Sequence, residues 1–164
     1  MLEIRPATRQ DVERLLDVAA SPARRAHLES RWVEQEQDDA VFLLAHDEGG
    51  IVGQTSLLRT SKYAEVAAAH DVAEINGLHA FVQGAGVGSA LIAASEELAR
   101  AWRRDAIGLG VGLENPGAAR LYARLGYQPT QFRVIDEWTE VDADGTVLVT
   151  HRDPCDYLLK PLPR

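Results

Sequence analysis

The spacing of apolar residues divides the first half of the chain into helices and strands. Apolar and polar residues alternate over 2–5, as in a strand with one buried face, and apolar residues recur at helical spacing over 12–19. Ser21-Pro22 ends this first helix and begins a more polar one, which is either a solvated face or a wall of an acceptor pocket. Residues 60–72 show no period and are expected to form a loop. The predicted elements are a strand at 2–5, helices at 9–20 and 22–37, and a hairpin of strands at 40–46 and 51–59.

The second half of the chain alternates strands with helices before it ends in hairpins. A glycine-rich turn opens a helix whose apolar residues step by four and three positions, which gives one buried stripe. Asn115-Pro116 is an N-cap followed by proline, Gly126 has the place of a C-terminal cap, and Asp153-Pro154 is expected to break the chain. This order indicates an α+β fold, with a mixed, largely antiparallel central sheet flanked by helices. The predicted strands are 73–80, 107–113, 132–141, 146–151 and 155–160.

Two of these strands carry glycines that a plain strand does not need. In the strand at 73–80, Gly77 lies where the apolar period of two slips, which indicates either a β-bulge with backbone groups open to a ligand or a plain strand end. In the next strand, Gly108, Gly110 and Gly112 share one face. We expect something bulky to lie flat against them: an aromatic ring, a close-packed helix or the arm of a bound cofactor.

The glycine-rich turn reads Gln83-Gly84-Ala85-Gly86-Val87-Gly88-Ser89. Glycines let the backbone approach a ligand and point several N–H groups one way, and the following helix adds its unpaired first-turn donors. The turn therefore predicts an anion site, most naturally for a phosphate or pyrophosphate, unless it is only a tight strand-to-helix connection. It lacks the lysine of a P-loop, and its GxGxG spacing departs from the GxGxxG of dinucleotide-binding folds.

Composition and charge narrow the class of protein. The chain has 164 residues, of which 46% are hydrophobic and 26% charged, as expected of one soluble domain spanning 1–164. There is no apolar run long enough for a membrane span and no signal-peptide pattern, and the single Cys155 fits a reducing compartment, so we expect a cytoplasmic protein. No cysteine or histidine cluster has metal-ligand spacing, and no metal is expected. The net charge of −8 argues against a nucleic-acid surface and is compatible with a cationic substrate.

Two separate stretches resemble one known family. Gln83, Gly86 and Gly88 match Gln/Arg-x-x-Gly-x-Gly/Ala, which resembles the pyrophosphate loop of the GNAT superfamily of acyl-CoA-dependent N-acyltransferases. Downstream, GVGLENPGAARLYARLGYQPT is similar to a second pattern of that family. The N-terminal Ile4-Arg5-Pro6-Ala7 and the closing segment 157–162 also resemble it, so the resemblance spans nearly the whole chain. The residues matching the second pattern are Asn115, Ala119, Leu121, Tyr122, Leu125, Gly126 and Tyr127.

The resemblance implies a GNAT-like fold that uses acetyl-CoA as co-substrate. In this family the loop amides hold the pyrophosphate, a bulged strand pairs with the pantetheine arm, and the next strand splays away to admit the thioester. The connection Ala80-Phe81-Val82 is about two residues shorter than the common pattern, and Gln83 replaces the commoner arginine, which leaves the backbone contacts to CoA open. The implied cofactor-binding residues are Leu78, His79, Ala80, Gln83, Gly84, Ala85, Gly86, Val87, Gly88, Ser89, Asn115, Ala119 and Tyr122.

The expected reaction moves an acetyl group from CoA directly to a primary amine of a small molecule or peptide. It needs a neutral amine, a stabilised oxyanion and a proton for the departing thiolate. The resemblance places Tyr122 near the thioester sulfur as the general acid. Glu74, beside the loop, is the first candidate base because burial can shift a carboxyl toward neutral pH, and His79 is the second because of its intrinsic pKa. A core tyrosine, a strand-edge carboxylate and a packed or exposed histidine are the purely structural interpretations.

Two other functions stay open from the sequence alone. The fold can bind acyl-CoA as a sensor without catalysis, or the loop can belong to a structural protein that binds ATP or NAD and not CoA. The acceptor amine depends on 22–37, 60–72 and 133–150, the variable parts of such a fold. A homodimer that pairs through the hairpin edge is also open.

Overall fold

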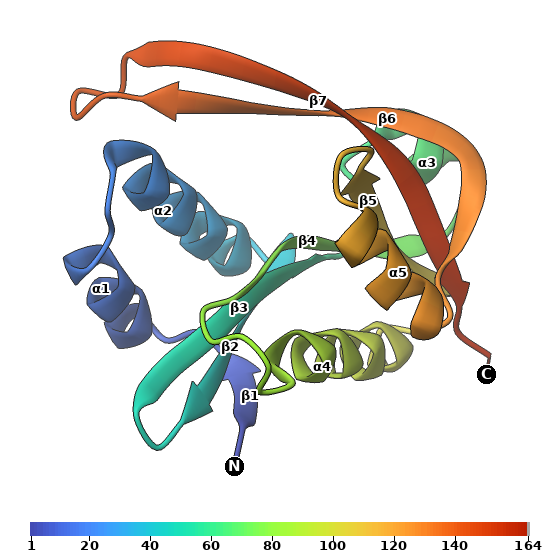
Figure 1. Ribbon diagram of the computed structural model, residues 1–164, viewed down its shortest axis with the longest axis horizontal. Helices are drawn as coiled ribbons and strands as arrows, with labels where there is room; N and C mark the ends of the chain where they lie inside the picture. Colours follow the sequence, from blue (N-terminus) through green and yellow to red (C-terminus); the bar gives the residue numbers. More distant parts are fainter. Residues whose placement is uncertain (164) are drawn as a thin grey trace.

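Seven strands within residues 1–163, the part of the chain that the computed structural model describes, form one mixed sheet (Figure 1). They are β1 (Glu3–Pro6), β2 (Ala40–Asp47), β3 (Gly50–Leu58), β4 (Val72–Ala80), β5 (Ala106–Gly112), β6 (Gln128–Val141) and β7 (Val147–Pro161). Their order across the sheet is β1-β2-β3-β4-β5-β7-β6. All neighbours are antiparallel except β4 and β5, which confirms the predicted mixed, largely antiparallel sheet.

Five helices in the same part of the chain cover the two faces of this sheet. They are α1 (Arg9–Asp17), α2 (Pro22–Glu36), α3 (Ala64–Ala69), α4 (Val87–Ala101) and α5 (Pro116–Arg124). α1 and α2 pack on Phe42 and Leu44 of β2, whereas α4 packs on Leu43 and Ala45, which point to the other face. None of these helices is long and apolar enough to cross a lipid bilayer. The sheet thus has an α2 face and an α4 face.

The parallel pair is short, because β4 and β5 separate after Glu74 and Gly108. Beyond this point β4 continues beside β3 as far as Ala80, and β5 continues beside β7 as far as Gly112. The edge of β4 that faces β5 therefore has no strand partner over 75–80. An unpaired strand edge presents free N–H and C=O groups, so this opening suits an extended ligand.

The segment 60–72 contains α3, so the expectation of a loop is wrong over that helix. α3 is a run of alanines around Val66 without a side-chain cap, and it shows no amphipathic period along its six residues. Val66 is fully buried and belongs to a hydrophobic cluster with Val134 of β6 and Tyr157 of β7. Tertiary packing thus decides a segment whose local pattern is weak.

β7 runs without interruption through Asp153-Pro154, so the predicted break into two strands is also wrong. Pro154 pairs with Ile135 of β6, and its carbonyl accepts a hydrogen bond of 3.2 Å from the Leu113 N–H on the β5 side. In an antiparallel strand the N–H and C=O of one residue point to the same neighbour. An N–H at position 154 would point past the end of β5, so the proline there removes no hydrogen bond between β6 and β7.

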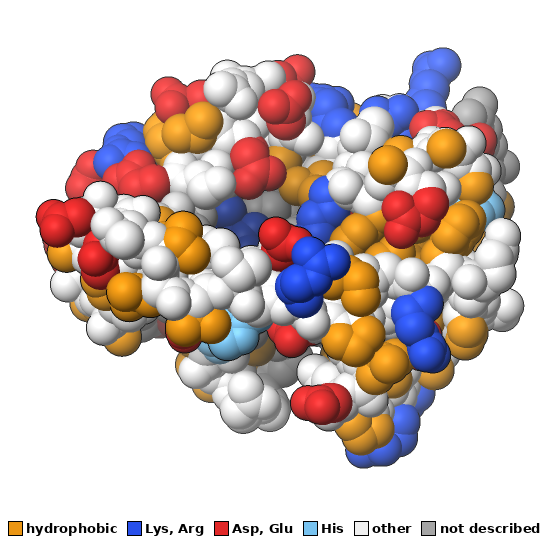
Figure 2. All heavy atoms as spheres, turned by 90° about the horizontal axis from the view of Figure 1, so that it is seen from above, with side chains coloured by type: hydrophobic (Ala, Val, Ile, Leu, Met, Phe, Trp, Pro, Cys, Tyr) orange, Lys and Arg blue, Asp and Glu red, His pale blue; other side chains and the backbone are white. Residues whose placement is uncertain are grey.

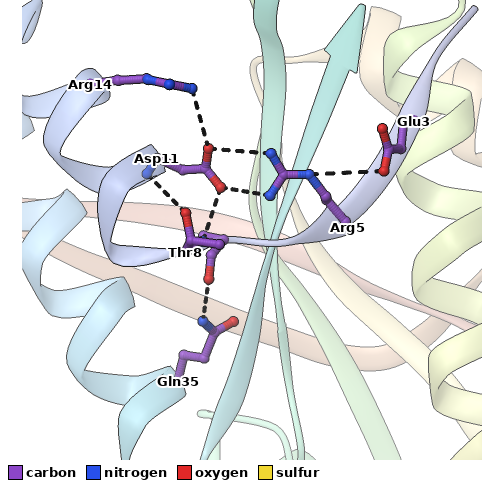
Figure 3. Close-up of polar contacts among 7 residues, drawn as sticks. Glu3, Arg5, Thr8, Asp11, Arg14 and Gln35 are labelled. Carbon is purple, nitrogen blue, oxygen red and sulfur yellow. Dashed lines mark hydrogen bonds and ion pairs between the residues drawn. The ribbon is translucent and has the colours of Figure 1, made fainter.

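A buried carboxylate, Asp11, ties β1 to the start of α1 (Figure 3). The Asp11 N–H donates to the Thr8 hydroxyl at 3.1 Å and the Thr8 N–H donates to the Asp11 carboxylate at 2.9 Å, so the two residues form a capping box. Arg5 donates to the same carboxylate at 2.9 Å. Burial alone would raise the pKa of Asp11, but these donors outweigh it and hold the pKa below its ordinary value. Gln35 of α2 donates to the Ala7 carbonyl at 2.9 Å, which fixes α2 to the same segment.

Candidate active site

β4 contains a bulge, which is one of the two structures that the sequence left open at Gly77. Its pairing with β3 joins Asn76 to Ser56 and His79 to Gln54, so two residues of β4 oppose one residue of β3. The bulge includes Gly77, whose φ of +66° lies in the left-handed region that favours glycine. It follows the last pair between β4 and β5. Backbone polar groups are therefore open where the two strands separate.

The glycine-rich turn ends β4 and begins α4. Gly84 and Gly86 have left-handed φ values of +75° and +74°. Gly86 is the N-cap of α4, and no side chain caps this helix end. The first-turn N–H groups and the positive end of the helix dipole are therefore open to an anion. An added Cβ at Gly84, Gly86 or Gly88 would meet no atom within 4 Å, so the surface of the turn is unobstructed.

The start of α4 lies close to the sheet because Gly53 of β3 has no side chain. A Cβ at Gly53 would come within 2.5 Å of Val87, the first residue of α4. Gly53 pairs with Ala80, the last residue of β4. The Gln83 side-chain amide donates a long hydrogen bond of 3.4 Å to the Ala80 carbonyl. The glycine turn is thus held at the end of β4, next to the opening between β4 and β5.

The glycine face of β5 is covered by an aromatic ring at one end. A Cβ added to Gly108 would lie 2.6 Å from the Tyr157 hydroxyl oxygen and 2.8 Å from carbons of its ring. A Cβ added to Gly110 would lie 3.4 Å from the Tyr63 hydroxyl, and one added to Gly112 would meet nothing within 4 Å. Of the three bulky groups that the sequence left open, an aromatic ring is the one that lies over Gly108.

Glu74 lies beside this ring with only 1% of its surface exposed. Its Oε1 accepts hydrogen bonds from the Ser61 hydroxyl at 2.6 Å and the Tyr157 hydroxyl at 2.8 Å, and its Oε2 accepts one from the Lys62 N–H at 3.3 Å. Burial raises the pKa of Glu74 above its ordinary value, against the lowering effect of these donors. A carboxyl with a raised pKa can accept a proton in chemistry near neutral pH.

A cavity of about 680 Å³ opens on the α2 face of the sheet. It is lined by residues of α2, β4 and β6, so the polar helix α2 does form a cavity wall. Figure 2 looks onto the side of the β6–β7 hairpin and shows a hollow with basic side chains deep inside it. The volume suits a small molecule. Charged and polar residues on its walls include His27, Ser30, Arg31, Glu34, Lys62, Glu74, Asn76, Asp136, Glu137 and Thr139.

The two candidate bases have different surroundings. Glu74 lines the cavity, whereas His79 is exposed and is not among the lining residues. The His79 ring lies edge-on to Phe81, with 5.0 Å between ring centres. Leu78, its neighbour, is half-buried against the hydrophobic cluster beneath α4 and α5. The cavity therefore brings together Glu74 and the bulge but not His79.

The second motif lies on the α4 face. Asn115 caps α5 by accepting a hydrogen bond of 3.1 Å from the Ala118 N–H, which confirms the predicted N-cap. Tyr122 and Ala119 are half-buried against the cluster beneath α4 and α5. The Tyr122 ring lies edge-on to Tyr127 at 5.9 Å, and its hydroxyl bonds to no other side chain or backbone group of residues 1–163. Burial raises the pKa of Tyr122, so the phenol keeps its proton.

Sequence reasoning did not single out Tyr157, Ser61 or Arg31 as site residues. Tyr157 reaches Glu74 from 83 positions away along the chain, and Ser61 lies in the segment that showed no period. Arg31 lies in α2 next to Trp32, one of the few apolar residues of that helix. Its place beside Trp32 is the one sequence signal that the Arg31 side chain points toward the protein interior.

The bulged β4, the uncapped glycine turn and the separation of β4 from β5 can be set beside known proteins. A family model described as "Acetyltransferase (GNAT) family" matches residues 9–127. The chain belongs to the GNAT acetyltransferase family. Membership in the GNAT family makes it an acyltransferase of the N-acetyltransferase type, and the matched residues include both sequence motifs. No curated protein sequence matches the chain.

Solved N-acetyltransferase structures share this GNAT fold. One is yncA, a putative acetyltransferase from Salmonella typhimurium solved with acetyl-CoA, at 15% identity over 99% of this chain and 95% of that chain, with a TM-score of 0.65. SpeG, a spermidine/spermine N-acetyltransferase from Vibrio cholerae solved with manganese ions, is 16% identical over 98% and 92%, with a TM-score of 0.67. The ribosomal-protein-alanine N-acetyltransferase from Brucella melitensis is 21% identical over 98% and 99%, with a TM-score of 0.68. At such identities the likeness concerns the fold, and it confirms the predicted GNAT-like architecture.

Proposed function

We propose that this GNAT protein transfers an acetyl group from acetyl-CoA directly to a primary amine of a small molecule or peptide. The observation that carries the proposal is the separation of β4 from β5 after Glu74, beside the bulge at Gly77. The opening lies between an uncapped helix N-terminus, on the α4 face, and the cavity on the α2 face. A thioester that enters from one face can meet an amine held on the other.

The residues around the opening fit acetyl-CoA as co-substrate. The uncapped start of α4, with the left-handed Gly84 and Gly86, suits a pyrophosphate, and Gln83, Ala85, Val87, Gly88 and Ser89 belong to the same turn. The unpaired edge of β4 at 78–80 offers backbone groups to the amides of a pantetheine arm, as a sheet edge does to a peptide. On this proposal Asn115, Ala119 and Tyr122 of α5 contact the same arm from the α4 face.

The proposed chemistry divides acid and base between the two faces. Acetyl-CoA supplies the acetyl group as a reactive thioester. Glu74, on the cavity wall, accepts a proton from the acceptor's ammonium group, directly or through a water, and so frees the amine to attack. The amine nitrogen bonds to the acetyl carbon, the bond between that carbon and sulfur breaks, and Tyr122, on the α4 face, donates its hydroxyl proton to the departing thiolate. The proton that the nitrogen loses as the amide forms goes to water, from which Tyr122 is reprotonated. His79 is the second candidate base, and its exposed ring would have to act through water.

Gly88→Asp tests the cofactor half of the proposal. Gly88 lies in the first turn of α4 without a positive φ, and a Cβ there meets open space, so the fold should be kept. The added carboxylate lies where a pyrophosphate must bind, and we expect at least about a 10²-fold loss of acetyl-CoA affinity. Gly88→Ala is the matched control and should bind normally. Wild-type protein should gain roughly 2.7 kcal/mol of stability at one hundred times the dissociation constant of acetyl-CoA.

Release of free CoA with a panel of amines tests the catalytic half. We expect release that depends on the amine and is lost in Gly88→Asp. Thermal stabilisation by acetyl-CoA with no CoA release for any amine would favour the alternative, a non-catalytic acyl-CoA-binding module. Equal thermal stabilisation by NAD would contradict the assignment to acyl-CoA.

A further inference from the structure

Most charges on the β6 side of the cavity are paired within the protein. Lys62 donates to the Asp136 carboxylate, and Arg152 donates to Glu137. Such partly exposed ion pairs contribute little to stability, but they neutralise each other. Arg31, which enters the cavity from α2, is different.

Arg31 is a largely buried cation with neutral partners. Its Nη1 donates to the Ser56 hydroxyl at 3.2 Å and to the Asn76 side-chain oxygen at 3.4 Å. Its Nε is buried and has no hydrogen-bond partner in the described part of the chain. Burial lowers the pKa of Arg31, and the fields of Glu34 and Asp136 offset this only in part. Neither carboxylate, nor any other within residues 1–163, forms an ion pair with Arg31.

The backbone of β4 is shaped to leave room for this guanidinium. Gly77 has a φ of +66°, and a Cβ added there would lie 2.1 Å from Nη2 of Arg31 and 2.5 Å from its Cζ. A side chain at position 77 would therefore displace Arg31. A buried cation without an anion is unfavourable, so the fold keeps an uncompensated charge next to the opening between β4 and β5.

We propose that Arg31 binds a carboxylate of the acceptor, and that the acceptor is a small amine of the amino-acid type. The proposal rests on the proposed function, because it takes the cavity as the acceptor site. A guanidinium offers two parallel N–H donors that match a carboxylate. Nη2 of Arg31 donates to no protein acceptor within residues 1–163 and is not buried, and the buried Nε beside it has no partner either. Neutral Ser56 and Asn76 orient the guanidinium without cancelling its charge.

The amine end of such a molecule has a place on the same strand. Glu74 and Asn76 lie two residues apart on β4, so they face the same side at a separation of about 7 Å along the strand. A small amino acid can reach from the Arg31 and Asn76 position to Glu74. Among the described residues that line the cavity, Arg31 is the arginine or lysine without a carboxylate partner, and this one positive charge suits a monoanion. Glu34 and the carboxylates of β6 would repel a phosphate dianion.

The test compares an amino acid with its carboxamide, its decarboxylated amine and the corresponding aminoalkyl phosphate, by CoA release at saturating acetyl-CoA. Wild-type protein should prefer the carboxylate by about 10²-fold or more in kcat/KM. Arg31→Met should lose about 10²-fold with the amino acid and less than about 3-fold with the decarboxylated amine. Arg31→Lys, which keeps the charge without the paired donors, should fall between them.

Arg24→Met is the matched control. Arg24 lies two turns earlier on α2, is also partly buried, and donates to Gln54 at 2.6 Å, but it does not line the cavity. This variant should keep the wild-type preference for the carboxylate. A preference lost equally in the Arg24 and Arg31 variants would overturn the proposal, because the effect would then come from α2 as a whole.

Other outcomes are equally decisive. Equal kcat/KM for the amino acid and the decarboxylated amine, a higher value for the phosphate, or an equal loss on both amines in Arg31→Met would overturn the proposal. In the last case Arg31 only joins α2 to the bulge. If the proposed function itself is wrong, acetyl-CoA gives no thermal shift and no amine causes release of CoA. Both proposals are then wrong. If Arg31→Met does not fold, the comparison of Arg31→Lys with wild type decides.

Discussion

The Tyr157 hydroxyl donates a hydrogen bond of 2.8 Å to the Glu74 carboxylate from a position 83 residues further along the chain. The Tyr157 ring lies against Gly108, the residue of β5 that pairs with Glu74 in the parallel ladder. A glycine on β5 thus makes room for a ring from β7, and the ring orients a carboxylate of β4. The proposed base is held at the last pair before the two strands separate.

Glu74→Gln should lower kcat/KM at neutral pH by about 10²-fold. Glutamine has nearly the same shape, and its oxygen can still accept the hydrogen bonds of Ser61 and Tyr157. The raised pKa of Glu74 means that the carboxylate forms, and wild-type activity rises, at a higher pH than for an exposed glutamate. The Glu74→Gln variant should therefore lack the acid limb of the profile, which is the fall of kcat/KM as the pH decreases. CoA release measured from about pH 5 to pH 9 checks this.

His79→Ala is the control for that experiment. His79 lies on the same strand, but its ring is exposed beside Phe81 and does not line the cavity. We expect a rate within about threefold of wild type and an unchanged acid limb. Loss of the acid limb in the His79 variant alone would transfer the role of base from Glu74 to His79.

The raised pKa of Glu74 also predicts that the stability of the protein depends on pH. Because its pKa is raised in the folded protein, the folded state binds this proton more tightly than the unfolded chain does. The contribution is fully present below the ordinary pKa of 4.5 and is lost as the pH rises through the raised value. A glutamine side chain does not ionise, so the Glu74→Gln variant avoids this loss of stability. The Tm of Glu74→Gln minus the Tm of wild type should therefore increase as the pH rises through that window. Thermal unfolding at several pH values measures the difference, and a constant difference would contradict the prediction.

Features set by local chemistry were predictable from the sequence. Gly77 lies in a bulge, one of the two structures that its place in a strand indicated, and Gly86 lies in the glycine-rich turn before α4; both have a positive φ. Asn115 caps α5, as its place before Pro116 predicted. Each of these residues reports its own backbone conformation, so no distant partner has to be known.

Features set by distant partners were not predictable. α3 depends on the burial of Val66 against the β6–β7 hairpin, and Pro154 is tolerated in β7 only because β5 ends beside it. The hydrogen bonds of Glu74 come from Ser61 and Tyr157, which no local pattern connects to it. Much of the fold, with the glycine-rich turn that begins α4, therefore follows from the sequence, whereas the surroundings of Glu74 need the assembled structure.

Gly108→Ala and Gly112→Ala form a matched pair on one face of β5. A Cβ at Gly108 would overlap the Tyr157 ring, so this variant should lose about 1–3 kcal/mol of unfolding free energy. It should also lower kcat/KM, because a displaced ring no longer orients Glu74. A Cβ at Gly112 meets open space, and its variant should change stability by less than about 0.5 kcal/mol. Denaturant unfolding of both variants is the measurement, and equal values would show that the ring does not require a glycine.

Tyr122→Phe separates catalysis from packing. The variant keeps the ring that packs edge-on to Tyr127 and removes a hydroxyl that bonds to no other described side chain or backbone group, so stability should change little. Acetyl-CoA affinity should stay within a few-fold of wild type. Turnover should fall by about 10-fold to 10³-fold, toward the lower end because a thiolate is a good leaving group.

Tyr127→Phe supplies the opposite pattern and so completes the test. The Tyr127 hydroxyl donates to the buried Glu96 carboxylate at 2.9 Å, and Glu96 also accepts from Lys160 at 2.9 Å. Removing one of these two donors should cost about 1–2 kcal/mol of unfolding free energy and leave turnover within about threefold. Thermal unfolding and steady-state CoA release on both variants measure the contrast. Full turnover in Tyr122→Phe with unchanged acetyl-CoA binding would show that Tyr122 is a packing residue and that the thiolate receives its proton from another group or from water.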